Sequence, residues 1–283
     1  MSGIKVPRET KEISTRDYLV SNEEFVVKEI KKGLLKTTPQ VSDKDIFNYY
    51  NSRDYLSHNK GSSFFSLAYS IASKFMLKRK FNLIAKYMGS SKRFLDFGCG
   101  VGDLVSVMQS KGYDSSGIEN NMSAYNECLK KKINIFKDLD TISSGFQLIS
   151  CWHSLEHLLD FNKALKKFYT LLNDDGFLIL AVPNHDSFDA KYYKKYWAGY
   201  DTPRHRYHFN KRAIVLAAKN AGFELLKSAP MFLDAFYVSV LSEKYKNNPF
   251  GFFKGFLIGV LSTICYLFTN NASSHYFVFQ KSN

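Results

Sequence analysis

Three glycines and two acidic residues stand close together in RFLDFGCGVGDLV, Arg93 to Val105. Gly98, Gly100 and Gly102 would let the backbone turn tightly and lie against a ligand, because glycine has no β-carbon. Glu119 follows about 20 residues after the loop, the spacing at which an acid holds a ribose diol in nucleotide-binding α/β folds. The pattern predicts a nucleotide-type ligand, either a dinucleotide or S-adenosylmethionine.

Two acidic side chains decide between these ligands. The dinucleotide fingerprint G-x-G-x-x-G requires glycine at the position of Asp103. Asp96 would repel a pyrophosphate, since like charges a few ångströms apart cost free energy in a dry pocket. S-adenosylmethionine instead presents a cationic ammonium and a cationic sulfonium, which suit the Asp96 carboxylate. We therefore expect S-adenosylmethionine as the cofactor.

The glycine loop lies within an alternation of strand-like and helix-like segments. The predicted strands are RFLDFG, DSSGIEN, INIFKD, FQLISCW, GFLILAVP, FELLKSAPMF and SHYFVFQK, and helices are expected to begin near Asp103, Met122, Leu155 and Phe161. Strands that alternate with helices predict an α/β fold with a doubly wound parallel sheet. Such sheets bind ligands at the carboxyl ends of their strands, so the site is expected there.

The segments LDFGCGVGDLV, GIEN, WHSLEHLLD and GFLILAVPN occur in this order. Together they resemble the class I S-adenosylmethionine-dependent methyltransferases, most closely the branch of the ubiquinone-biosynthesis O-methyltransferases and their uncharacterised bacterial relatives. The resemblance implies a Rossmann-like, doubly wound sheet of seven strands whose last strand, SHYFVFQK, is antiparallel. It also implies cofactor contacts from Asp96, Gly98, Gly100, Gly102, Glu119, Asn120, Asp138, Leu139, Trp152 and His153.

Two histidines and a glutamate follow the fourth predicted strand. On a helix, His153, Glu156 and His157 would face one point, because residues three and four apart are neighbours. H-x-x-E-H is also the signature of certain zinc peptidases, but here it stands inside a methyltransferase series. Some relatives of the family carry a similar E-x-x-E-H cluster that holds a divalent ion. A metal site at these three residues is one hypothesis, and orientation of the pocket floor is the favoured one.

The stretch WAGYDTPRHRYHF lies in an expected lid insertion, residues 184–210, after the fifth strand. Trp197, Arg204 and His208 are predicted to stack on an acceptor ring and neutralise an anion, although an ordinary surface loop is the alternative. Methyl transfer to a hydroxyl requires removal of a proton, and histidine titrates near neutral pH. His157 or His205 is therefore the predicted catalytic base.

Residues 1–90 are expected to form an α/β appendage to a methyltransferase domain at 91–283. EEFVVKEIKKGLLKTTPQ predicts a hairpin, and SDKDIFNYYNSRDYLSH and FFSLAYSIASKFMLKRKFNLIAKYM predict helices. Relatives often carry C-x-x-C-G-L here, half of a zinc knuckle. Glu29 and Lys32 occupy the two cysteine positions, so no structural zinc is expected. The isolated Cys99, Cys128, Cys151 and Cys265 predict no disulfide and a cytoplasmic protein.

The formal net charge of +13 suits an anionic partner, such as a nucleic acid, a phosphate-bearing substrate or a membrane surface, or else a solvated surface. An apolar helix is expected at 249–269. Its uninterrupted part begins at Phe256 and is shorter than the ~20 residues of a membrane span. We expect this helix to be buried, to form a homodimer interface, or to lie on the inner face of the membrane.

The most favoured function is O-methylation of a small-molecule, glycan or lipid-linked acceptor. The alternative is an RNA methyltransferase or an RNA-binding protein, which the net charge of +13 suggests. Lysines are spread along the whole chain and no RNA-binding fold is recognisable, so the nucleic-acid hypothesis is the weaker one.

Overall fold

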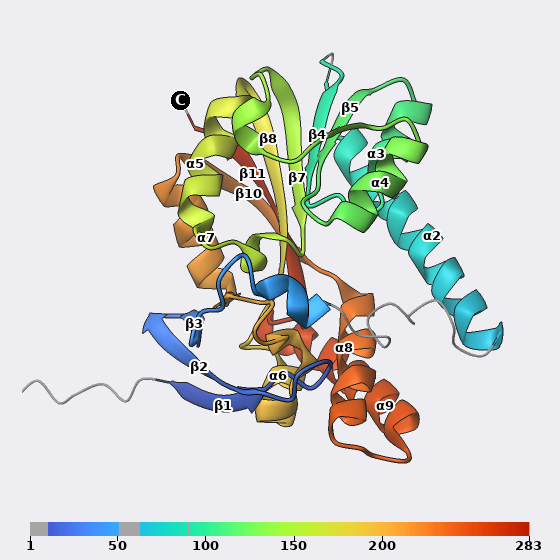
Figure 1. Cartoon of the computed structure of the whole chain (residues 1–283), viewed down its shortest axis with the longest axis vertical. Helices are drawn as coiled ribbons and strands as arrows, with labels where there is room; N and C mark the ends of the chain where they lie inside the picture. Colours follow the sequence, from blue (N-terminus) through green and yellow to red (C-terminus); the bar gives the residue numbers. More distant parts are fainter. Residues whose placement is uncertain (1–10, 51–62, 90, 283) are drawn as a thin grey trace, which may run out of the picture.

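The computed structural model describes residues 11–50, 63–89 and 91–282, which form two sheets with helices around them (Figure 1). The strands are β1 Glu12–Arg16, β2 Glu24–Lys31, β3 Leu34–Thr38, β4 Arg93–Phe97, β5 Asp114–Ile118, β6 Asn134–Phe136, β7 Phe146–Trp152, β8 Leu172–Pro183, β9 Tyr207–Phe209, β10 Phe223–Pro230 and β11 Ser274–Lys281. The α-helices are α2 Ser63–Ala85, α3 Asp103–Ser110, α4 Met122–Lys130, α5 Phe161–Leu171, α6 Phe188–Tyr193, α7 Lys211–Asn220, α8 Phe232–Tyr245 and α9 Gly251–Thr269. Short 3-10 turns are η1 Ile46–Tyr50, η3 Leu139–Thr141, η4 Leu155–His157, η5 Lys194–Tyr196 and η6 Ala198–Tyr200.

The larger sheet has seven strands in the order β10-β11-β8-β7-β4-β5-β6. Every strand runs in the same direction except β11, which is antiparallel to both of its neighbours. This arrangement confirms the predicted Rossmann-like sheet with an antiparallel last strand. The register places Asp96 of the central strand between Gly117 of β5 and Ser150 of β7.

Both faces of the seven-stranded sheet are covered, because its strands alternate apolar side chains between two cores. In β4, Phe94 packs in the core under α2 and α3, whereas Leu95 and Phe97 pack in the core under α5 and α7. Figure 1 shows these two pairs of helices on opposite sides of the sheet. Burial on both faces explains why the strands read as nearly continuous apolar runs in the sequence.

Four of the described helices, α4, α5, α6 and α7, begin with polar N-cap side chains that fix where they start. The Asn121 side chain accepts hydrogen bonds from the Ser123 and Ala124 amides, and Asp160 and Asn210 cap α5 and α7 in the same way. A side-chain cap satisfies backbone donors that the first turn cannot, and it contributes about 1 kcal/mol. These caps place the starts of α4 and α5 at the predicted residues, Met122 and Phe161.

The smaller sheet is antiparallel, in the order β1-β2-β3-β9. It contains the expected hairpin, β2 and β3, whose turn closes with a 2.8 Å hydrogen bond from the Gly33 amide to the Glu29 carboxylate. Its fourth strand, β9, comes from the expected lid and pairs Phe209 with Leu34. The boundary expected at residue 90 is therefore crossed by a hydrogen-bonded sheet. Of the two expected N-terminal helices, the second is α2. The first contains the short η1 in its described part, and its residues 51–58 lie outside the described residues.

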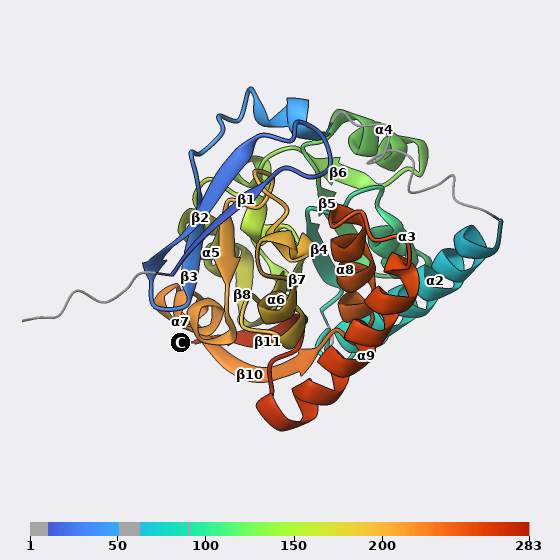
Figure 2. The same ribbon diagram turned by 90° about the horizontal axis from the view of Figure 1, so that it is seen from below.

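The helices α8 and α9 form an antiparallel pair at the edge of the molecule, with α9 outermost (Figure 2). α9 approaches α8 through glycines: a β-carbon on Gly255 would lie 2.5 Å from the Val240 Cα. In the described part of the chain, α9 alone is long and apolar enough to cross a membrane, judged by length and composition. Only 28% of its most apolar stretch is buried, so α9 is not a helix buried against the seven-stranded sheet.

Candidate active site

The glycine loop connects β4 to α3 at the carboxyl end of the central strand. Gly98, Gly100 and Gly102 have φ values of 70°, 56° and 76°, in the left-handed region that favours glycine. A β-carbon on Gly98 would overlap the Ser154 side chain, and one on Gly102 would overlap Ile133. A β-carbon on Gly100 would meet no atom within 4 Å. The loop therefore packs tightly at two glycines and leaves its open side at Gly100.

Glu119, just after β5, turns its carboxylate toward this loop. One oxygen accepts a 2.9 Å hydrogen bond from the Gly100 amide, and the other accepts a 2.7 Å hydrogen bond from the Asn121 amide. These contacts hold the acid at the loop, where it can accept from a ribose diol. The predicted neighbours Asn120 and Asp138 are exposed at the same edge, and Leu139 is half-buried beside them.

Asp96 is buried at the end of β4, with 4% of its surface exposed. Burial raises the pKa of its carboxyl group to about 6, although a 2.5 Å hydrogen bond from Ser150 and the charge of Lys80 act in the opposite direction. A buried carboxylate at this place is unfavourable without a cation beside it. The site is thus suited to a ligand whose nearest group is positively charged.

The segment after β7 differs from the helix that the spacing predicts. β7 ends at Trp152, His153 has a left-handed φ of 52°, and only Leu155–His157 form a 3-10 turn. A left-handed residue interrupts helical spacing, so His153 does not share a helix face with Glu156 and His157. Its Nε2 atom lies 3.0 Å from Asp234 Oδ2 in α8, and its Nδ1 atom lies 3.6 Å from Glu156 Oε1. Burial lowers the pKa of His153, but these two carboxylates outweigh it and raise the pKa to about 9.

The Glu156 side chain lies at the centre of a histidine cluster. It is 1% exposed, and neither of its carboxylate oxygens accepts a hydrogen bond from the described residues. His205 Nε2 lies 3.9 Å from Glu156 Oε1, and the His157 and His205 rings meet edge to face with centroids 4.7 Å apart. A buried carboxylate that accepts no hydrogen bond is costly, so Glu156 depends on the nearby His153 imidazolium to balance its charge.

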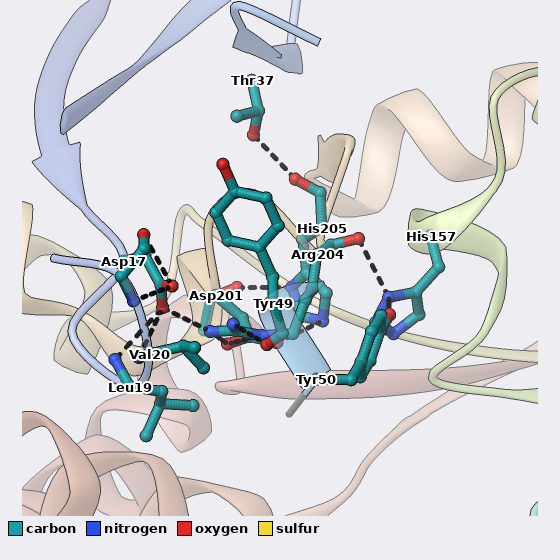
Figure 3. Close-up of polar contacts among 12 residues, drawn as sticks. Asp17, Leu19, Val20, Thr37, Tyr49, Tyr50, His157, Asp201, Arg204 and His205 are labelled. Atoms are coloured by element: carbon teal, nitrogen blue, oxygen red, sulfur yellow. Dashed lines mark hydrogen bonds and ion pairs between the residues drawn. The ribbon is translucent and has the colours of Figure 1, made fainter. Parts of the chain in front are cut away.

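Both imidazoles of the cluster are oriented by backbone carbonyls (Figure 3). His157 Nδ1 lies 3.0 Å from the Arg204 carbonyl oxygen, and His205 Nδ1 lies 3.0 Å from that of Gly199. Because a carbonyl only accepts, each Nδ1 carries a proton, and a neutral ring then keeps its lone pair on Nε2. Burial lowers the pKa of His157 to about 4, so this imidazole is neutral at pH 7. His157 is half-buried, whereas His205 is buried.

A family model described as a methyltransferase domain matches residues 71–228, which include the glycine loop, Glu119 and the histidines after β7. The chain is a class I S-adenosylmethionine-dependent methyltransferase. Its fold is similar to that of magnesium protoporphyrin IX methyltransferase from Synechocystis with bound S-adenosylhomocysteine, with a TM-score of 0.56 and 15% identity over 85% of this chain and 100% of that chain.

A second similar structure is a phosphoethanolamine N-methyltransferase from Haemonchus contortus, in complex with phosphomonomethylethanolamine and S-adenosylhomocysteine. The TM-score is 0.50 and the identity 16%, over 82% of this chain and 60% of that one. A comparison with curated proteins finds no match. S-adenosylmethionine is the cofactor of the family, so the cofactor predicted from Asp96 is confirmed. The individual contact residues stay predictions.

A divalent ion would fit the methyltransferase at Glu156, His157 and His205, whose donor atoms all lie within 4.8 Å of one another. His205 takes the place that the sequence assigned to His153. A carboxylate with two imidazoles is a donor set that zinc and iron accept, and an ion there would polarise an acceptor oxygen. The His153 imidazolium, 3.6 Å from Glu156, already offsets the carboxylate charge, so the cluster is electrostatically complete without an ion.

Binding of S-adenosylhomocysteine to the methyltransferase is expected to weaken below pH 6. The ligand's ammonium favours the ionised Asp96, so affinity is full above the carboxyl's pKa of about 6 and is lost as the pH falls below it. Below this pKa, linkage predicts that the affinity falls about tenfold for each pH unit. Titration calorimetry on either side of pH 6 measures this slope. Asp96→Asn cannot titrate and should bind weakly with a flat profile, whereas a flat profile in the unaltered protein would contradict the assignment.

Arg204 is buried, with 1% of its surface exposed, and joins the amino-terminal segment to the loop of the histidine cluster (Figure 3). Its Nη2 atom lies 3.0 Å from Asp17 Oδ1 and 2.6 Å from Asp201 Oδ1, and its Nη1 atom donates to the Tyr49 carbonyl. Arg206 is also buried and donates to the His157 carbonyl at 3.1 Å. The Arg206 guanidinium thus fixes the backbone at His157, and the Arg204 guanidinium fixes the loop whose carbonyl orients that ring.

The other residues predicted to face the acceptor are buried as well. Trp197 is 2% exposed and donates from Nε1 to Asp189 at 2.7 Å, and His208 Nε2 lies 2.9 Å from the Thr37 hydroxyl. Together with Arg204, these side chains form an internal wall between the small sheet and α8, where the sequence suggested an exposed lid. Their contact with the acceptor stays a prediction.

Trp152 lines a groove between α2 and the start of α8. The groove has a volume of about 320 Å³. Its cationic lining residues are Arg79, Lys80, Lys86 and Lys227. The Lys80 ammonium lies 4.5 Å from the centre of the Trp152 ring, a cation–π contact. The groove is therefore basic, and its lining includes the residue that precedes His153.

Several residues of the methyltransferase site were missed by sequence reasoning. Ser150 donates to Asp96 because the register of β4 and β7 places the two side by side. The only indication of this role in the sequence is that Ser150 is a polar residue inside an apolar strand. Asp234 and Lys80 reach the site from α8 and α2, and no spacing in the sequence connects them to it.

Proposed function

We propose that this methyltransferase transfers a methyl group to a hydroxyl oxygen of a small-molecule, glycan or lipid-linked acceptor, with His157 as the general base. The observation that carries the proposal is a neutral, half-buried imidazole whose Nε2 keeps a lone pair beside the buried Glu156 carboxylate. A neutral amine already has a free lone pair, whereas a hydroxyl gains most from a base that removes its proton during transfer. The resemblance to ubiquinone-biosynthesis O-methyltransferases supports the same acceptor.

S-adenosylmethionine supplies a methyl group activated by the sulfonium charge and leaves as S-adenosylhomocysteine. Asp96 holds the cationic end of the ligand, and Glu119 holds the ribose beside the open side of the loop at Gly100. His157 Nε2 takes the proton of the acceptor hydroxyl as the oxygen bonds to the methyl carbon. Glu156 then stabilises the imidazolium, because an opposite charge in a buried site favours the protonated ring.

The acceptor atom can be identified with labelled S-adenosylmethionine and cell extract. Extract separated into lipid, polysaccharide, RNA and small-molecule fractions is incubated with the protein, and the labelled product is isolated. We expect a methyl ether, which survives the alkali that hydrolyses methyl esters, in one of the fractions other than RNA. Label on nitrogen would contradict the proposal, and label that ribonuclease releases from the RNA fraction would favour the RNA alternative.

Metal dependence is tested in the same assay. Dialysis against a chelator is expected to leave turnover unchanged, since His153 already balances the charge of Glu156. A loss of turnover that a divalent ion restores would assign the cluster of Glu156, His157 and His205 to that ion instead.

A further inference from the structure

α9 turns a row of large apolar side chains toward solvent. Phe253 is 75% exposed and Phe268 is 85% exposed, near opposite ends of the helix. The row also includes Phe252, Phe256, Leu257, Leu261, Ile264 and Leu267, and the whole set is called here the outer face. Soluble proteins seldom expose a contiguous apolar patch of more than a few hundred Å², and larger patches mark interaction sites.

The opposite face of α9 is fixed to the protein. Gly255 and Gly259 lie against Val240 and Phe236 of α8, so closely that a β-carbon on either glycine would overlap α8. The Ser262 hydroxyl donates a 2.7 Å hydrogen bond to buried Asp189. α9 therefore cannot turn its outer face inward, and it cannot cross a bilayer without giving up these contacts. The helix is placed to lie along a surface.

α9 also contacts one wall of the basic groove. The Tyr266 ring of α9 packs edge-on against Phe232 of α8, with centroids 5.7 Å apart, and Phe232 is a wall of the groove. Figures 1 and 2 both place α2, the other wall, on the same side of the molecule as α9. An apolar surface thus adjoins a passage that carries four cationic side chains.

The charge of this region indicates what covers the outer face. No acidic residue follows Glu243 in the sequence, and none lies between Met76 and Lys86 in α2. A second copy of the chain would bring no acidic side chain from α9 to complement the groove cations. Anionic lipid headgroups complement the cations, and the acyl boundary beneath them accepts phenylalanine and leucine side chains.

We infer that α9 docks the protein on an anionic lipid bilayer, with the outer face in the headgroup layer and the groove cations against the lipid phosphates. The groove, which is lined in part by Trp152, would then face the membrane. Delivery of a lipid-linked acceptor through it rests on the proposed function. The docking itself does not.

Flotation of the full chain with vesicles tests the docking. We expect the protein to float with vesicles of phosphatidylcholine and phosphatidylglycerol, and much less with phosphatidylcholine alone. Phe253→Ser combined with Phe256→Ser and Leu267→Ser should lower the bound fraction about tenfold or more. Leu129→Ser with Leu216→Ser is the matched control, since these two side chains are each 52% exposed on α4 and α7, and it should bind like the unaltered protein.

A second pair of variants tests the electrostatic half of the inference. Lys86→Glu with Lys227→Glu should weaken binding to the anionic vesicles, as should added salt, because both reduce the attraction to headgroups. Binding that is equal on both vesicle types, or unchanged in the outer-face variant, would overturn the inference. A dimer that dissociates in the outer-face variant and binds no vesicle would assign the face to a second copy. Flotation requires no acceptor, so its failure leaves the methyl-transfer proposal intact.

Discussion

Replacing His157 with alanine is expected to lower kcat by about two to four orders of magnitude, the usual effect of losing a positioned base. Affinity for S-adenosylhomocysteine should stay unchanged, because the glycine loop, Asp96 and Glu119 are separate from this ring. The imidazole is neutral at pH 7, since burial lowers its pKa to about 4, and its Nε2 is free to take the proton. Turnover of labelled cofactor and titration calorimetry measure the two quantities.

His157→Gln is the matched control for a structural role. The glutamine amide can still donate to the Arg204 carbonyl, the partner of His157 Nδ1, but it cannot accept a proton near neutral pH. We expect this variant to be as stable as the unaltered protein and as inactive as His157→Ala. Near-normal turnover in His157→Gln would show that the ring only positions the loop, and His205 would then be the remaining candidate base.

Arg204→Met is expected to lower the free energy of unfolding by about 3–5 kcal/mol, because it leaves two carboxylates without their cation in a dry environment. Asp17 is 1% exposed, and Asp201 lies 2.6 Å from the guanidinium. Methionine keeps most of the apolar stem, so the loss reports the charge network more than packing. Urea unfolding followed by circular dichroism gives the difference.

Arg16→Met provides the comparison on the surface. Arg16 pairs with Glu24 at 3.0 Å, the same separation as Arg204 and Asp17, but its side chain is 40% exposed and that of Glu24 is 80% exposed. An exposed pair of this kind contributes at most about 1 kcal/mol. If both variants lowered the free energy of unfolding equally, the Arg204 network would contribute no more than an ordinary surface ion pair.

The cofactor half of the site could be predicted because its determinants are local. The loop, Asp96 and Glu119 lie within one strand–helix–strand unit, and their spacing reflects its geometry. The histidine half depends on contacts between distant segments: Asp17 and Arg204 are 187 residues apart, and Arg204 and His157 are 47 apart. No periodicity encodes such contacts. The helical spacing of His153, Glu156 and His157 misled for a local reason, the left-handed backbone at His153.

The prediction of a lid followed from composition, and composition does not specify burial. Aromatic and basic residues that are close in sequence suit a surface that grips a ligand. The same residues also suit an interior junction when carboxylates and carbonyls are available, as they are for Trp197 and Arg204. Asp17 and Asp189 are the partners that make this stretch an interior junction, and no sequence pattern identifies them as such.

The placement of β11 has a practical consequence for anyone trimming this protein. The family match ends at residue 228, yet β11, Ser274–Lys281, is inserted between β8 and β10 and so fills the middle of that half of the sheet. A fragment cut at the matched boundaries would split β10 and leave β8 as an unpaired edge strand, which can pair with other chains and aggregate. Shortened versions should therefore keep the chain through β11.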